Sequence, residues 1–104
     1  MNISKTDWKL FCERVPAWQE RYMERLLREY AALLTKPGNA SDHFWELEKR
    51  INKDKKHPGV IMQLEKSSAV WDITYLIRMG VITEDDLGGF SGELVETVKD
   101  LLSR

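Results

Sequence analysis

Apolar side chains recur every three or four residues along most of this 104-residue chain. That spacing is typical of α-helices with one buried face. No segment sustains the alternation of apolar and polar residues that is typical of a β-strand. Capping residues, prolines and glycines divide the periodic pattern into segments. The sequence therefore predicts an all-α fold: one compact helical domain over residues 1–104, a bundle of about five helices with one short helical turn.

Two helices are expected in the first third of the chain. Ser4 and Asp7 are spaced as an N-cap and its reciprocal acid at the start of the first helix. Pro16 predicts its end, because a proline disfavours the helical conformation in the residue before it. Pro16 also suits the first position of a second helix, which runs to about Lys36. Apolar residues occupy half the circumference of this second helix, so it needs cover from more than one neighbour.

The rest of the chain contains three further helical segments and one turn. A third helix is expected to begin near Ser41 or Asn39, with the narrow apolar stripe of a peripheral helix. A fourth is expected over residues 58–79, closed by Gly80 in a left-handed cap. A capping box predicts the short turn at residues 83–87, and a serine cap predicts the last helix, which follows Ser91.

The predicted fourth helix is apolar on nearly every side. A helix of this kind is either buried all round or has a second surface to cover. In the second case, the candidate self-association surface consists of Ile73, Leu76 and Ile77. The protein would then be a homodimer, whereas complete burial by the other helices would leave it a monomer.

Trp45 is the candidate residue for a surface that binds another protein. It lies about 100° from the apolar stripe of the third helix, as the helical rotation per residue places it. Tryptophan is enriched among the residues that dominate protein interfaces. The alternative is that neighbouring helices cover Trp45 at the edge of the core.

A helix-turn-helix that binds nucleic acid is the alternative function. The predicted third and fourth helices are joined by a short glycine-containing turn, and basic residues gather before it. The candidate contacts are Lys53, Lys55, Lys56, Gln63 and Lys66. Against this alternative, the predicted fourth helix is too apolar to lie in a groove for most of its length. The net charge of −1 also argues against a dedicated binder of polyanions.

No catalytic, cofactor-binding or metal-ligating constellation is visible in the sequence, so we expect no enzyme, no cofactor and no metal. His43 and Glu46 have the spacing of half a carboxylate-bridged metal site, but no second pair completes it. The single cysteine, Cys12, fits a reducing compartment. No apolar run approaches the roughly 20 residues that span a bilayer, and no signal peptide is visible. These features predict a cytoplasmic protein without a membrane partner.

Charge is sorted along the chain. Residues 1–66 carry a net charge of +3, and residues 67–104 carry −4. The sorting either orients the C-terminal helices against the basic first part of one molecule, or steers association with a second molecule or a charged partner.

Three segments, PAWQERY (16–22), FWELEKR (44–50) and GVITEDDL (80–87), resemble a family of small helical bacterial proteins that has no assigned function. Sequences of this kind sometimes carry a multidrug-transporter label, which the missing membrane segment makes physically implausible for this chain. The resemblance implies a helical protein and transfers no functional residue. The leading hypothesis is a protein–protein interaction or regulatory module that self-associates through its fourth helix.

Overall fold

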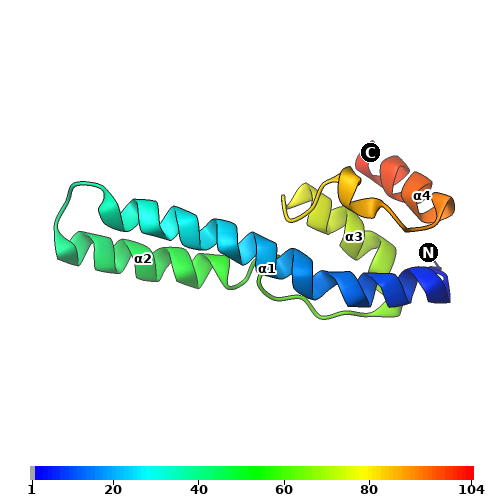
Figure 1. Ribbon diagram of the computed structural model, residues 1–104, viewed down its shortest axis with the longest axis horizontal. Helices are drawn as coiled ribbons and strands as arrows, with labels where there is room; N and C mark the ends of the chain where they lie inside the picture. Colours follow the sequence, from blue (N-terminus) through cyan, green and yellow to red (C-terminus); the bar gives the residue numbers. More distant parts are fainter. Residues whose placement is uncertain (1) are drawn as a thin grey trace.

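Residues 2–104 are described by a computed structural model in which all regular structure is helical (Figure 1). The elements are α1 (Lys5–Thr35), α2 (Ala40–Asp54), the 3₁₀ turn η1 (Lys66–Ser68), α3 (Ala69–Arg78), the 3₁₀ turn η2 (Glu84–Leu87) and α4 (Gly92–Leu102). The all-α prediction is confirmed. The described residues form four α-helices rather than five, because the first two predicted helices are one.

The predicted helix break at Pro16 is wrong, since α1 runs through this residue for 31 residues. One buried stripe continues on both sides of the proline, from Phe11 and Val15 to Trp18 and Tyr22. A proline inside a helix costs about 3 kcal/mol. Burial of each large apolar side chain contributes roughly 1.5–3 kcal/mol, so the stripe as a whole outweighs that cost. Pro16 itself is exposed to solvent.

The first half of α1 lies beside α3 and α4, and these three helices form the body of the molecule (Figure 1). Its centre is a set of fully buried side chains, Phe11, Ile73, Leu76, Val98 and Leu101. The turn η2 lies on the same core, since Leu87 is also buried. The core therefore joins the two ends of the sequence.

The caps at Ser4, Gly80, Thr83 and Ser91 are confirmed, but Asp7 is not the reciprocal acid of Ser4, because its carboxylate accepts hydrogen bonds from Ser91 instead. Ser4 and Ser91 each accept a hydrogen bond from the backbone N–H three residues later, at 3.1 and 3.2 Å. Gly80 closes α3 with a φ of 76°, in the left-handed region that favours glycine. At η2 the backbone N–H of Thr83 donates to the Asp86 carboxylate at 2.9 Å. These signals succeed because each depends on contacts within one turn of the chain.

The predicted fourth helix over residues 58–79 is wrong in its first half, where residues 61–65 have no regular structure and α3 begins only at Ala69. In this segment Val60, Met62 and Leu64 pack against the core, while the residues between them are exposed. An extended chain advances about 3.3 Å per residue, against 1.5 Å in a helix. The extended form lets a short segment run back along α1 to the body (Figure 1).

The second half of α1 and the antiparallel α2 form a hairpin that extends beyond the body (Figure 1). The molecule measures 52 × 23 × 22 Å. Its radius of gyration of 16.6 Å exceeds the roughly 13 Å expected for a rounded domain of about 100 residues. The hairpin is therefore covered by the rest of the chain only at its base.

Candidate functional site

Polar contacts attach α2 to α1. The Tyr30 hydroxyl donates to the buried Asp54 carboxylate at 2.6 Å, and Arg50 lies 3.4 Å from the same carboxylate and 3.0 Å from Glu29. Burial of the phenol and its hydrogen bond to Asp54 raise the pKa of Tyr30 to about 12. Asp54 is the only buried residue of α2. The hairpin is thus held in register by a polar cluster, whereas an apolar core holds the body.

Large apolar side chains of the hairpin remain exposed to solvent. Leu27 and Leu34 on α1 are 63% and 47% exposed. On α2, Phe44 and Trp45 are 63% and 64% exposed, and Ile51 is exposed as well. The Phe44 and Trp45 rings meet edge to face, with centroids 4.9 Å apart. We call these five residues the hairpin face.

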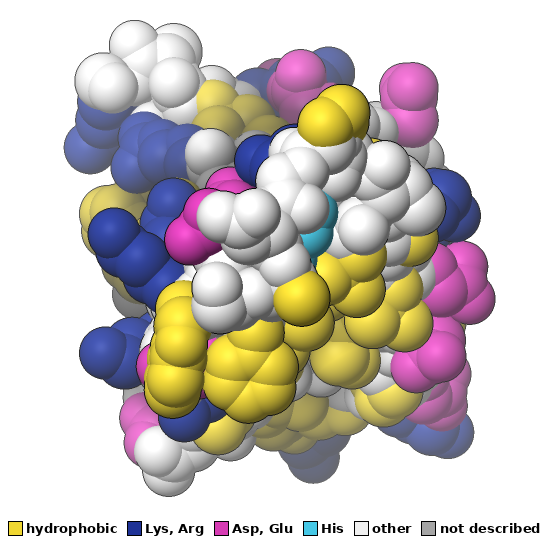
Figure 2. Space-filling view, turned by 90° about the vertical axis from the view of Figure 1, so that its left-hand side faces the viewer, with side chains coloured by type: hydrophobic (Ala, Val, Ile, Leu, Met, Phe, Trp, Pro, Cys, Tyr) yellow, Lys and Arg dark blue, Asp and Glu magenta, His cyan; other side chains and the backbone are white. Residues whose placement is uncertain are grey.

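A groove of about 300 Å³ runs between the two helices at the base of the hairpin. It is lined by Met23, Leu26, Leu27, Tyr30, Ile51, Asp54, Lys55 and Val60. Seen from the hairpin end, hydrophobic side chains form a broad continuous area, bordered by basic side chains on one side and acidic ones on the other (Figure 2). The groove and the hairpin face share Leu27 and Ile51, so they form one apolar surface.

The predicted self-association surface on the fourth helix is wrong. Ile73 and Leu76 are 0% and 1% exposed, and Ile77 is half-buried against the same core. They face the core because α4 and the first half of α1 together cover that side of α3. The exposed side of α3 instead carries Trp71, Tyr75 and Met79, at helical spacing of four residues. The helix therefore has a second apolar surface, but on the opposite side from the predicted one.

Trp45 is exposed, so the described part of the chain does not cover it as edge-of-core packing. The sequence did not single out Leu27 and Leu34. The feature of the sequence that could have identified them is the half-apolar circumference of the second predicted helix. A helix of that kind needs more than one neighbour to cover it. Within residues 2–104, α2 is the single helix that lies along this part of α1 (Figure 1).

The predicted helix-turn-helix does not form. Lys53, Lys55 and Lys56 are exposed at the end of α2. Gln63 lies in the extended segment and Lys66 begins η1, so no continuous helix presents them beside the lysines. The extended connection takes the place of the recognition helix that the sequence predicted.

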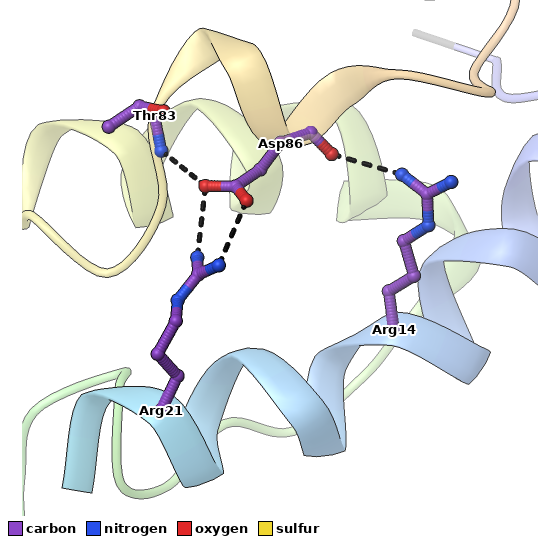
Figure 3. A network of polar contacts seen from close by, with 4 residues as sticks. All are labelled: Arg14, Arg21, Thr83 and Asp86. Carbon is purple, nitrogen blue, oxygen red and sulfur yellow. Dashed lines mark hydrogen bonds and ion pairs between the residues drawn. The ribbon is translucent and has the colours of Figure 1, made fainter. Parts of the chain in front are cut away.

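Asp86 joins η2 to α1 (Figure 3). Arg21 forms a two-pronged ion pair with its carboxylate at 2.9 and 3.1 Å, and Arg14 donates to its backbone oxygen at 3.0 Å. Burial alone would raise the pKa of Asp86, but the hydrogen bonds from Arg21 and Thr83 together lower it. This ion pair connects the basic first part of the chain to the acidic second part, so some of the sorted charge acts within one molecule.

The described residues contain no group of three His, Cys, Asp or Glu side chains that is placed to hold a metal ion. None of the helices in residues 2–104 is both long and apolar enough to cross a membrane. A hollow of about 550 Å³ lies near the starts of α1 and α4, beside Asp7 and Ser91. Asp7 already accepts two hydrogen bonds from Ser91, so it is not free to bind a ligand there.

Searches among known protein families, curated proteins and solved structures give no match to this chain. Its relation to the helical family that the three sequence segments resemble therefore stays a prediction. The hairpin face and its groove are the most extensive candidate site, and their apolar chemistry suits the binding of another protein.

Proposed function

We propose that this protein is a cytoplasmic protein–protein interaction module that binds its partner through the hairpin face. It acts by binding and not by catalysis. The observation that carries the proposal is the exposure of Leu27, Phe44 and Trp45 on one protruding hairpin, at 63%, 63% and 64%. Single exposed apolar residues are common on protein surfaces, but a continuous apolar patch is typical of binding sites.

Two further features support this function. The apolar residues are mounted on helices whose register is set by the buried Asp54 and its contacts with Tyr30 and Arg50. A face that is rigid before binding loses less conformational entropy when a partner binds. The patch also includes Trp45 and Phe44, and large aromatic residues, tryptophan above all, supply much of the binding energy in interfaces.

A photoreactive amino acid at position 45 tests the proposal in cells of origin. We expect it to form a covalent link to a protein, while the same residue at position 96, an exposed site on α4, does not. Leu27→Glu should abolish the link from position 45, since it places a charge in the apolar patch. Links that form equally from positions 45 and 96, or no protein link from position 45, would contradict the proposal.

The nucleic-acid alternative has a distinct signature. Retardation of RNA or DNA at low salt, lost when Lys53, Lys55 and Lys56 are neutralised, would support it in place of protein binding. Lys55 also lines the groove, so its neutralisation could weaken the binding of a protein as well as of nucleic acid. The crosslink from position 45 separates the two cases, because it reports protein binding at the hairpin face directly.

A further inference from the structure

We propose that His57 is a pH-sensitive switch at the base of the hairpin: its neutral ring holds the start of the segment that connects α2 to the body, and its protonated ring releases it. This connecting segment consists of residues 57–65, and His57 is its first residue. The switch needs no partner, since it depends on contacts within one chain. It therefore goes beyond the proposed function and does not rest on it.

Three successive backbone N–H groups of the connecting segment bind His57. The N–H of Gly59 donates to the ring atom Nδ1 at 3.0 Å. The N–H groups of Val60 and Ile61 donate to the backbone oxygen of His57 at 2.9 and 3.0 Å. Only the first of these bonds involves an atom that titrates, so protonation of the ring acts directly on the position of Gly59.

The bond from Gly59 requires a neutral His57 ring. A neutral imidazole has one nitrogen that accepts a hydrogen bond and one that carries a proton. Because Nδ1 accepts the N–H of Gly59, the proton of the neutral ring is on Nε2. A second proton would go on Nδ1, where it would face the N–H of Gly59, and two donors do not bind each other. Protonation therefore breaks this contact and drives the two residues apart.

The His57 ring also packs against α1. It is stacked on the ring of Tyr22, with centroids 4.5 Å and planes 6° apart. Tyr22 is buried, and the guanidinium of Arg25 lies 4.7 Å from the centroid of the same ring. This packing removes water from one face of His57, and water is what a charged imidazolium would need.

The charged and polar groups around His57 come from three elements. Burial lowers the pKa of His57, and the positive charge of Arg25 on α1 lowers it further. A hydrogen bond to the backbone of Met79, after α3, and the negative charge of Asp54, at the end of α2, raise it without reversing the shift. Because folding lowers this pKa, the neutral ring stabilises the connection above the unfolded pKa of about 6.5, and that stabilisation is lost as the pH falls through the folded pKa.

The connecting segment can separate from α1 without unfolding of the body. Besides the stack on Tyr22, the Gln19 side chain donates to the backbone oxygen of Pro58 at 3.0 Å, and residues 57–65 belong to no helix. Segments of this kind open at a lower free energy than the core of a domain. Val60 lines the groove, so the release of the segment also changes the shape of the groove.

A nuclear magnetic resonance titration of the full chain over about pH 5–8 tests the switch. We expect the His57 ring to titrate below about pH 6.5, and the Gly59 amide and Tyr22 ring signals to shift with the same midpoint. Arg25→Gln should raise this midpoint, because it removes a positive charge. Arg28→Gln, at an exposed residue of the same helix, is the matched control and should move it less. A midpoint at or above about 6.5, or a Gly59 signal that does not follow it, would overturn the proposal.

Hydrogen exchange measures the release itself. The intrinsic exchange rate at each pH is divided by the measured rate, so that the ratio reports protection. We expect the protection of the Gly59 and Val60 amides to fall as the pH passes below the midpoint, while that of Val98, a buried residue of α4, stays constant. Unchanged protection of Gly59 and Val60 would overturn the release. An equal loss at Val98 would also overturn it, because the whole chain would then unfold in acid.

Asparagine at position 57 separates the titration from the bond. An asparagine side chain accepts the N–H of the residue two positions later, as the His57 ring does, but it does not titrate. In His57→Asn we expect the protection of Gly59 to be the same from about pH 5 to about pH 8. His43→Asn is the matched control, because it replaces the only other histidine and should leave the pH response intact. A response that persists in His57→Asn, or that disappears in His43→Asn, would overturn the assignment to His57.

Discussion

Asp7 and Ser91 join the first turns of α1 and α4, although 84 residues separate them in sequence. One carboxylate oxygen of Asp7 accepts the backbone N–H of Ser91 at 2.9 Å, and the other accepts its hydroxyl at 2.5 Å. The hydroxyl oxygen of Ser91 in turn accepts the N–H of Leu94 at 3.2 Å. One buried acid thus positions the cap of the last helix against the start of the first.

This relationship predicts the effect of Asp7→Ala. The change leaves the Ser91 N–H without its partner in a site where Asp7 is 4% exposed, so the free energy of unfolding should fall by about 1–3 kcal/mol. Urea denaturation measures the loss. Asp100→Ala, at an exposed residue paired only with Arg104, should change stability by less than about 0.5 kcal/mol. Equal effects of the two changes would contradict the role assigned to Asp7.

Gly59→Ala should destabilise the protein. A methyl group at this position would lie 2.3 Å from the Tyr22 ring, which is buried and stacked on His57 with centroids 4.5 Å apart. Overpacking of this kind typically costs about 1–3 kcal/mol. Gly92→Ala is the control, because a Cβ there meets no atom within 4 Å and alanine favours the helix. A thermal scan should lower the Tm of the first variant and not of the second. A Tm of Gly59→Ala at or above the original would disprove the close approach.

The Arg21–Asp86 ion pair predicts an acid dependence of stability. Folding lowers the pKa of Asp86. The contribution of the ion pair to the free energy of unfolding is therefore fully present above the unfolded pKa of about 3.9, and it is lost as the pH falls through the folded pKa. Arg21 is 54% exposed, so we expect no more than about 1 kcal/mol. The stability difference between the original chain and Asp86→Asn, measured by urea denaturation, should be constant near neutral pH and shrink below about pH 4. If the stability difference between the two proteins instead grew on acidification, the ion pair could not be its cause.

Pro16→Ala should stabilise the protein. Pro16 is exposed and lies inside α1, so its replacement removes no buried contact and restores one backbone N–H to the helix. The gain should be on the order of 1–3 kcal/mol, seen as a higher midpoint in urea denaturation. Ala17→Gly, at the adjacent exposed position in the same helix, should have the opposite sign. Destabilisation by Pro16→Ala would mean that the packing of α1 requires the backbone geometry that proline imposes.

The predictions from the sequence are correct where the residues that determine a feature all lie within one turn of the chain. The caps at Ser4 and Ser91 and the left-handed Gly80 are of this kind. The prediction failed at Pro16, where a local penalty is smaller than the burial gained on both sides. It failed again at residues 60–65, where the exposed and half-buried residues alternate as in an extended chain. The sequence itself does not alternate there, because the exposed position 61 is an isoleucine, so only the structure reveals the extended form.

At the candidate site, too, one prediction from the sequence is correct and another is wrong. Trp45 was predicted as a partner residue from its place beside the apolar stripe of its helix, and it is exposed. Ile73 and Leu76 were predicted at a surface and lie in the core. Periodicity shows that α3 has apolar residues on more than one side, but it does not show which side the neighbouring helices cover.

Residue types and their spacing along a few turns are enough to set the all-α class, the caps and the excess of apolar surface. Only the contacts between distant segments decide that α1 continues through Pro16, that residues 61–65 are extended, and that Leu27, Phe44 and Trp45 stay exposed on the hairpin. The physical reason is that burial is a property of the assembled helices. Which side of each helix is removed from water depends on contacts between segments far apart in the chain, and those contacts outweigh local preferences of a few kcal/mol.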